Sequence, residues 1–256
     1  MCTALIHRGQ DVIFGFNMDI SMGALAFDLY ATEQCFFIGC PADTEGFSGE
    51  IPSFYRVADG VRKCHGVNSR GMFAACLNNM NCHKAPFRLA EDACSLDQVV
   101  DDVLSGQRTL EDVRRFAEEK EITTLPTGAV DVPHPGFHSL MGDRDGHIMV
   151  LEPGNGYAMI REKYAVMSNF PLLHLPPDLN DETAGFYGRD RYDTAVRMLQ
   201  QAGDRLSPEK ALEILDAVKQ TGTWATRVSF VYSCNEKTVQ YCREGDFNNI
   251  RMHRFQ

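Results

Sequence analysis

The residue with the most chemical potential in this chain is a cysteine at position 2, directly after methionine. Methionine is normally trimmed from a nascent chain when the next side chain is small, and trimming here leaves Cys2 with a thiol and a free α-amine on one carbon. A thiol with a pKa of ~8.5 beside an amine with a pKa of ~7.7–8.0 can pass its proton locally, which gives a thiolate at neutral pH. Cys2 therefore predicts an N-terminal nucleophile, although a cysteine at position 2 alone is more often incidental.

The residues after Cys2 predict a β-hairpin that positions the thiol. Two apolar runs flank Arg8-Gly9-Gln10, which is a turn signal. If this turn holds three residues, Cys2 pairs with Phe16, and a shift of one residue puts Asn17 opposite instead. Directly opposed side chains lie roughly 4.5–5.5 Å apart at Cβ. We therefore expect Phe16 beside the thiol and Asp19, just past the strand end, within reach of the α-amine.

A series of motifs along the chain resembles one enzyme family. Met-Cys-Thr followed by a hairpin into Gly-x-Asn-Met-Asp is similar to the choloylglycine hydrolase and penicillin V acylase family of N-terminal nucleophile cysteine hydrolases, which act on linear amide C–N bonds. Acid-ceramidase-like amidases and acyl-CoA-dependent penicillin acyltransferases are relatives of that family. Further matching stretches follow in the family's order: HGVNSRGMFAACLN at 65–78, FHSLMGDRDGHIMVLE at 137–152, VMSNFP at 166–171, Asp190-Arg191-Tyr192, and a C-terminal hairpin at 228–242.

The resemblance implies a catalytic set, position by position. Cys2 is implied to be the nucleophile and its α-amine the base, with Asp19 orienting that amine. Asn78 and Asn169 are implied to belong to the oxyanion hole and to the group that anchors the amine. Arg191 is implied to be the site arginine, and its place at a helix start, where the helix dipole disfavours a cation, is consistent with a functional role.

One position departs from the family pattern. The family usually has arginine in Gly-Arg-Asn-x-Asp, where this chain has Phe16. Apolar surface in place of a cation desolvates the thiol, and desolvation raises a thiol's pKa. We therefore expect a higher thiol pKa and a more alkaline activity optimum than the arginine pattern gives.

The implied substrate pocket is apolar. Apolar residues in and after the nucleophile hairpin, and one after Asn169, are candidates for its walls. Each of them is equally well explained as an ordinary residue of the hydrophobic core. They are Phe16, Met18, Met22, Leu25, Phe27 and Phe170.

Composition fits a soluble enzyme of one domain, residues 1–256. The chain is 44% hydrophobic and carries a net charge of −10, which argues against nucleic acid or an anionic membrane surface as the main partner. The odd count of nine cysteines, with no signal-peptide pattern at the start, predicts a cytoplasmic location. The spacing of cysteines and histidines matches no zinc motif, so we expect neither metal nor cofactor.

The apolar periodicity predicts strands first, then helical pairs alternating with hairpins. Strands are expected at 2–17, 34–39, 71–78, 138–141, 147–152, 157–160, 164–169, 227–233 and 238–243. Helices are expected after Ser95, Thr109 and Ser207-Pro208, and around 192–199. Periodicity alone predicts an α+β domain. The resemblance implies more, a four-layer α-β-β-α sandwich of mostly antiparallel sheets.

Together these features predict an amidase that cleaves a linear N-acyl amide through a Cys2 thioester. Bile-acid conjugates, phenoxyacetyl amides and N-acyl amines or amino acids stay open as substrates. Two alternatives remain: acyl transfer to an amine through the same thioester, and a catalytically lapsed small-molecule binding protein that keeps the fold. The sequence does not fix the oligomeric state, and a homo-oligomer is compatible with it.

Overall fold

The computed structural model describes residues 1–21, 27–41, 61–79, 94–123, 136–173 and 186–256. The predicted pocket residues Met22 and Leu25 lie outside these ranges. Within them the chain forms two large antiparallel sheets and two pairs of helices, together with one short parallel pair of strands.

The nucleophile hairpin lies in the middle of the first sheet. Its two strands are flanked by the strand that carries the Asn169 segment on one side and by the C-terminal strands on the other. In spatial order the sheet contains β12 (Tyr164–Met167), β1 (Cys2–Arg8), β2 (Val12–Asp19), β13 (Thr226–Ser233), β14 (Thr238–Arg243) and β15 (Arg251–Arg254).

The second sheet packs face to face on the first. Its strands are β11 (Gly156–Ile160), β10 (Ile148–Glu152), β9 (Gly136–Gly142), β6 (Phe73–Asn79), β5 (Val61–Asn68), β4 (Cys35–Pro41) and β3 (Asp28–Ala31). A separate parallel pair joins β7 (Cys94–Ser95) to β8 (Ile122–Thr123).

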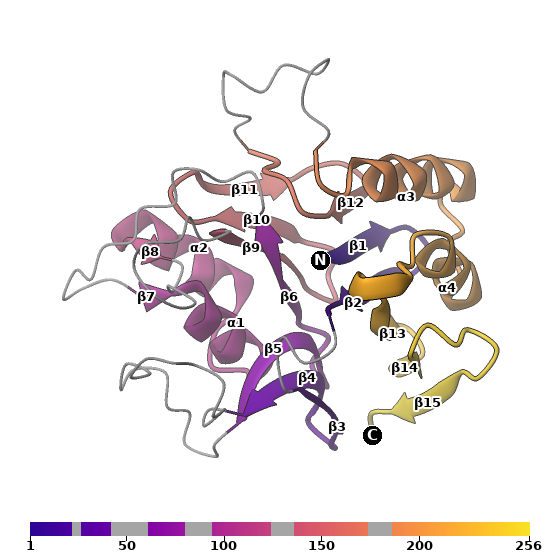
Figure 1. Ribbon diagram of the computed structural model, residues 1–256. Coiled ribbons are helices and arrows are strands. Elements are labelled where there is room, and N and C mark those ends of the chain that lie inside the picture. The colour runs from indigo at the N-terminus through magenta and orange to yellow at the C-terminus, as the bar shows by residue number, and fades with distance from the viewer. Residues whose placement is uncertain (22–26, 42–60, 80–93, 124–135, 174–185) are drawn as a thin grey trace.

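Helices cover the outer face of each sheet (Figure 1). The second sheet is covered by α1 (Leu96–Leu104) and α2 (Leu110–Glu119), at the left of the figure. The first sheet is covered by α3 (Arg189–Ala202) and α4 (Pro208–Ala217), at the right, and a short 3-10 helix, η2 (Gly222–Trp224), precedes β13. The layer order is α-β-β-α, which confirms the predicted sandwich. No helix of the described residues has both the length and the apolar character needed to span a membrane.

Helix starts follow the predicted capping signals. The Ser95 hydroxyl accepts from Gln98 N, and the Ser207 hydroxyl accepts from Lys210 N ahead of Pro208. Thr109 and Asp112 form a reciprocal capping box at α2. An N-cap hydroxyl of this kind stabilises a helix by about 1 kcal/mol.

Side chains alternate between the two faces of each strand. The apolar ones therefore form one core between the two sheets and one core under each pair of helices. The inter-sheet core is rich in aromatic rings: Phe14 stacks on Phe73 with ring centroids 5.0 Å apart, and Phe16 lies 5.7 Å from Phe230. Cys2 belongs to this inter-sheet core. The nucleophile candidate therefore lies between the two sheets.

The register of the hairpin differs from both predicted registers. Cys2 pairs with Met18, while Phe16 pairs with Ala4. The turn occupies residues 9–11 because Arg8 belongs to the strand, where its N–H donates to Lys163 O at 2.8 Å and its guanidinium donates to Gly146 O. Phe16 nevertheless stays on the inter-sheet face, two residue pairs along from Cys2.

Burial in the inter-sheet core gives the first prediction. Phe73 is fully buried and stacked on Phe14. We expect Phe73→Ala to lower the free energy of unfolding by about 3–5 kcal/mol, because it removes apolar contact and leaves a cavity. Urea unfolding measures this, with Met252→Ala at an exposed edge-strand position as the control, expected within about 0.5 kcal/mol of the parent. Equal effects of the two changes would contradict the assignment of the core.

Candidate active site

Cys2 is the first residue of β1, and its backbone nitrogen is held by a side chain from another strand end. The Cys2 N–H donates to Asn169 Oδ1 at 3.1 Å. The side chain is 9% exposed and faces the inter-sheet core beside Met18. Burial raises the pKa of the Cys2 thiol, and this increase exceeds the lowering caused by the N-terminal amine and Arg191. Burial is the main cause of this increase over an ordinary thiol, and a pKa higher than that of the arginine pattern stays a prediction.

Asp19 ends β2 at the same end of the sheet as Cys2, with its side chain toward α3. Its Oδ1 accepts a hydrogen bond of 2.6 Å from the Thr226 hydroxyl, and its Oδ2 lies 3.4 Å from Arg191 Nη1. The amine of Met1 donates to the Asp19 backbone carbonyl. Burial raises the pKa of Asp19 to about 6, against the lowering effects of Thr226 and Arg191.

Arg191 connects the members of the group from the first turn of α3. Its Nη1 donates to Cys2 O at 2.6 Å and to Thr3 Oγ1 at 2.7 Å, and its Nη2 donates to Asn169 Oδ1 at 2.6 Å. The side chain is 5% exposed. The helix begins at Gly188, whose φ of +83° and lack of a Cβ leave room for the guanidinium.

Asn169 lies two residues after the end of β12 and touches three other members of the group. Its Oδ1 accepts from Cys2 N and from Arg191, while its Nδ2 donates to the Asn78 backbone carbonyl at 2.7 Å. Asn78 lies on β6 of the second sheet, so Asn169 spans both sheets. Cys2, Asp19, Asn169 and Arg191 thus converge as the sequence predicted.

Asn78 reaches this group through its main chain. Ala75 and Leu77 face the inter-sheet core, whereas Ala74 and Cys76 face the helices. By the same alternation the Asn78 side chain belongs to the helical face and the Asn79 side chain to the inter-sheet face. Sequence reasoning did not single out Asn79. It is 1% exposed, and its Oδ1 has no hydrogen-bond partner among the described residues.

Phe16 is fully buried and stacks on His65 of β5, with ring centroids 4.4 Å apart. The His65 Nδ1 accepts from Cys76 N at 3.2 Å, so the neutral ring carries its proton on Nε2. Burial, and to a lesser degree the nearby N-terminal amine, lower the pKa of His65 to about 3. Where the family pattern has a cation, this chain therefore has a neutral aromatic pair. The stretch 65–68 was noted as a motif, but its strand was not predicted.

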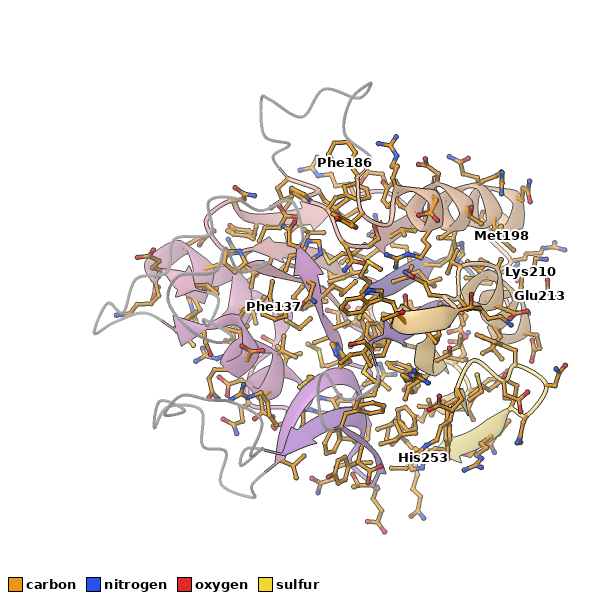
Figure 2. All side chains as sticks on the ribbon, viewed as in Figure 1. Phe137, Phe186, Met198, Lys210, Glu213 and His253 are labelled. Carbon is orange, nitrogen blue, oxygen red and sulfur yellow. The ribbon has the colours of Figure 1, made fainter. Side chains whose placement is uncertain are left out.

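The other predicted pocket residues that can be placed pack on the core around the group. Met18 lies opposite Cys2, and Phe27 is partly buried against the inter-sheet core. Phe170 packs between Phe186, labelled in Figure 2, and Tyr192 of α3 at centroid distances of 5.5 and 5.2 Å. Phe170 thereby holds α3 against the Asn169 segment. Its role as a pocket wall stays a prediction.

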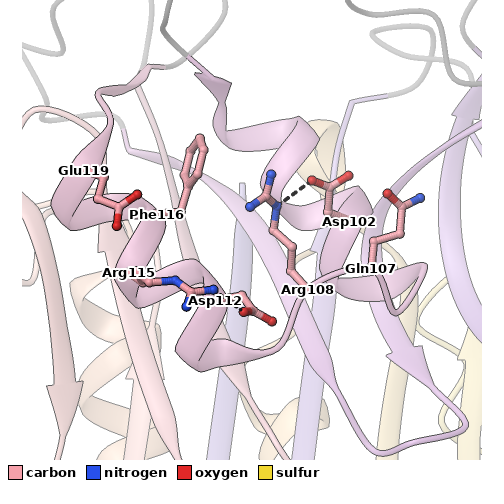
Figure 3. A pocket seen from close by; sticks show the side chains of 7 residues that line it. All are labelled: Asp102, Gln107, Arg108, Asp112, Arg115, Phe116 and Glu119. Atoms are coloured by element: carbon pink, nitrogen blue, oxygen red, sulfur yellow. Dashed lines mark hydrogen bonds and ion pairs between the residues drawn. The ribbon is translucent and has the colours of Figure 1, made fainter.

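One cavity in the described part of the chain adjoins the group. It has a volume of about 420 Å³ and is bordered by Met1, Gly188 and Arg191 and by polar residues of α3 and of the segment after α4. Another cavity, of about 430 Å³, lies between α1 and α2 (Figure 3). There Arg108 is bonded to Asp102 at 2.7 Å, so its charge is already matched.

One exposed turn holds three groups of the metal-ligating type. The ligand atoms of Asp143, Asp145 and His147 lie within 4.8 Å of one another. The Asp143 carboxylate accepts from the backbone nitrogens of Asp145 and His147 and lies 2.8 Å from the His147 ring. These bonds account for the cluster as a turn motif.

Comparison with solved structures identifies the fold. No protein-family model matches the chain, and no curated protein matches its sequence. A mutant of the conjugated bile acid hydrolase from Clostridium perfringens superposes with a TM-score of 0.65 at 14% identity, covering 98% of this chain and 92% of that one. Penicillin V acylase from Agrobacterium tumefaciens superposes with a TM-score of 0.57 at 16% identity, covering 94% and 83%. The chain has the fold of the N-terminal nucleophile hydrolases.

In this fold the group around Cys2 lies at the start of β1, between the two sheets. A second variant of the Clostridium perfringens enzyme superposes with a TM-score of 0.63 at the same 14% identity, covering 98% and 92%. At such identities the superpositions establish the architecture. The roles of the individual residues rest on the contacts described above.

The buried Asp19 carboxyl gives a pH prediction. Its folded pKa of about 6 lies above its ordinary value of 3.8, so the folded state holds the proton more tightly. Stability from this group is fully present below pH 4 and is lost as the pH rises to about 6, by roughly 3 kcal/mol. We expect the difference in unfolding free energy between the parent and Asp19→Asn to fall by that amount between pH 4 and pH 7 in urea titrations. A difference that does not change with pH would contradict the raised pKa.

Proposed function

We propose that the protein is an amidase that hydrolyses a linear N-acyl amide, with Cys2 as nucleophile once the Met1–Cys2 peptide bond has been cleaved. One observation carries the proposal: Cys2, Asp19, Asn169 and Arg191 come from four separate segments and are joined by hydrogen bonds at one strand end. The fold shared with two amide hydrolases supports it.

The contacts assign a role to each group. After cleavage the Cys2 nitrogen is an α-amine, 3.1 Å from Asn169 Oδ1. The amine takes the thiol proton, and the thiolate attacks the amide carbonyl carbon to form a tetrahedral intermediate. The C–N bond then breaks, and the α-ammonium gives its proton to the departing amine. Water attacks the thioester, with the amine again as base, and releases the acid and the free thiol.

Asn169 is also suited to the oxyanion. An amide NH₂ has two N–H groups, and one donates to the Asn78 carbonyl. In this proposal the second N–H meets the negative oxygen of the tetrahedral intermediate. A single donor of this kind contributes about 2.7–4 kcal/mol to transition-state stabilisation.

The surroundings of Cys2 divide the substrate into two halves. The leaving nitrogen must lie within reach of the α-amine, on the side where Met1 now borders the 420 Å³ cavity. Asp190, Lys219 and Gln220 in its wall suit a polar amine half. On the other side Cys2 has only neutral neighbours, the Phe16–His65 stack and Met18, which are themselves buried. In this proposal these neutral neighbours favour a hydrophobic acyl half without a carboxylate.

The nucleophile assignment predicts a defined maturation. We expect the active protein to begin at Cys2, and intact mass spectrometry should show the loss of Met1 and the transient gain of one acyl group with substrate. Cys2→Ala should abolish turnover without unfolding the protein. Cys76→Ala, a buried cysteine facing the helices, is the matched control and should change only stability, by about 1 kcal/mol.

Two outcomes would overturn this mechanism. One is full activity from a homogeneous preparation in which Met1 is still attached, because its α-amine is not that of Cys2. The other is the absence of any thioester from matured protein with a wide panel of amides, which would favour the lapsed binding protein. Release of a new amide when a second amine is added would instead identify an acyltransferase.

The division of the substrate predicts where specificity resides. A buried acyl methylene contributes about 0.8 kcal/mol, so each added CH₂ should raise kcat/KM about fourfold until the pocket is full. The measurement is an acyl-length series on one reporter amine, followed by an amine series on the best acyl group. A flat acyl series together with a hundredfold response to the amine would contradict the assignment of the two halves.

A further inference from the structure

A buried carboxylate lies behind the candidate active site, and its acceptor sites are all used. Glu152, at the end of β10, is 1% exposed. Its Oε1 accepts from Leu172 N at 2.6 Å and lies 3.2 Å from His138 Nδ1. Its Oε2 accepts from Leu173 N at 3.2 Å and from Asn155 Nδ2 at 3.3 Å. A carboxylate has about four lone-pair sites, so this set of donors matches the ionised form.

The ring of His138 bridges Glu152 and the segment that carries Asn169. Its Nε2 lies 2.8 Å from the Ser168 backbone carbonyl, which can only accept, so Nε2 carries a proton. Its Nδ1 lies 3.2 Å from Glu152 Oε1. The two side chains of this pair are 0% and 1% exposed. Burial opposes ionisation of Glu152, but the bonds from His138 and Leu172 outweigh it and hold the pKa of Glu152 below its usual value.

His138 and Glu152 bind the segment 168–173 at two points, and Asn169 lies between these two points in the sequence. His138 holds Ser168 O on one side, and Glu152 holds the N–H groups of Leu172 and Leu173 on the other. His138 and Glu152 both belong to the second sheet, whereas the segment they bind continues β12 of the first sheet (Figure 1). The pair makes no direct contact with Cys2 in the described structure.

We propose that Glu152 and His138 are positioning residues for the reaction, which hold the 168–173 segment so that the Asn169 amide meets Cys2 and the oxyanion. The proposal rests on the proposed function, because it concerns the same site. A buried ion pair is not by itself a source of net stability, since desolvation offsets its attraction. Fixed geometry at Asn169 is what the pair supplies here.

The first test is kinetic. Glu152→Gln keeps the size of the side chain and removes the charge and half of its acceptor capacity. We expect kcat to fall about 10- to 100-fold with KM within about twofold, because a displacement near 1 Å of a catalytic group costs about a hundredfold. Asp102→Asn is the matched control: Asp102 is also buried and ion-paired, but it lies on α1 in the outer layer. It should leave kcat unchanged.

A double-mutant cycle separates positioning from general stability. If Glu152 acts through Asn169, Glu152→Gln should change kcat less than about twofold in an Asn169→Ala background. Independent, multiplicative losses would overturn the proposal, as would a parental kcat in Glu152→Gln. If Glu152→Gln does not fold, His138→Gln replaces it in the same cycle, since it leaves the Glu152 bonds to Leu172 and Leu173 in place.

A second readout does not depend on turnover. In a ¹⁵N-asparagine-labelled protein, the Asn169 side-chain amide is assigned by its loss in Asn169→Ala. We expect slow hydrogen exchange of this amide in the parent and in Asp102→Asn, and exchange at least tenfold faster in Glu152→Gln. Unchanged exchange would overturn positioning. A third result is possible, in which the parent forms no thioester but its Asn169 amide exchanges slowly, and Glu152→Gln removes this protection. That result would contradict the proposed function and would support the positioning role.

Discussion

The candidate site depends on one constraint, the burial of the Arg191 guanidinium. A buried charge without partners is costly, and removing a partner from a buried pair typically costs about 3–5 kcal/mol. Arg191 is satisfied by Cys2 O, Thr3, Asn169 and Asp19, which come from three different strand ends. Because the guanidinium is planar and rigid, satisfying it fixes these groups relative to one another. The helix start at Gly188 follows from the same need, since a side chain there would collide with the guanidinium.

The second constraint is that the site joins the two sheets. Apolar packing sets the distance between the sheets, but it specifies direction weakly because it is non-directional. At the strand end where Cys2 lies, directional links run through the Asn169 segment, which bonds to Asn78, His138 and Glu152 of the second sheet. Further polar links between the sheets lie away from Cys2, from Arg8 to Gly146 and from Arg243 to Asp28.

Much of the architecture could be predicted from local signals. The caps at Ser95, Thr109 and Ser207 located three helices because a hydroxyl at a helix start acts through its own neighbours in sequence. The strand β5 was missed because its first half carries Arg62 and Lys63 on a half-buried surface, which weakens the alternation. The exposed edge strand β15 was missed for the same reason.

The residues of the site were predicted better than their arrangement in space. The residue types at positions 2, 19, 169 and 191 carry chemistry that motifs reveal, and the structure brings them together. The pairing of Cys2 with Met18 was not predicted because it depends on Arg8, whose partners are Lys163 and Gly146, far along the chain. The alternation of side chains along 73–79 was sufficient to predict that Asn79 points toward the inter-sheet core. The stacking of His65 on Phe16 could not be predicted in this way, because it depends on how the two sheets pack together.

The contacts of Cys2 have a consequence for the proposed maturation. Asn169 binds the Cys2 nitrogen, and Arg191 binds the Cys2 carbonyl. Both bonds are open to a Cys2 nitrogen that is an amide or an α-amine, because each of these carries an N–H. Under the proposed function, the loss of Met1 therefore changes the basicity of this nitrogen and leaves its hydrogen-bond partner the same.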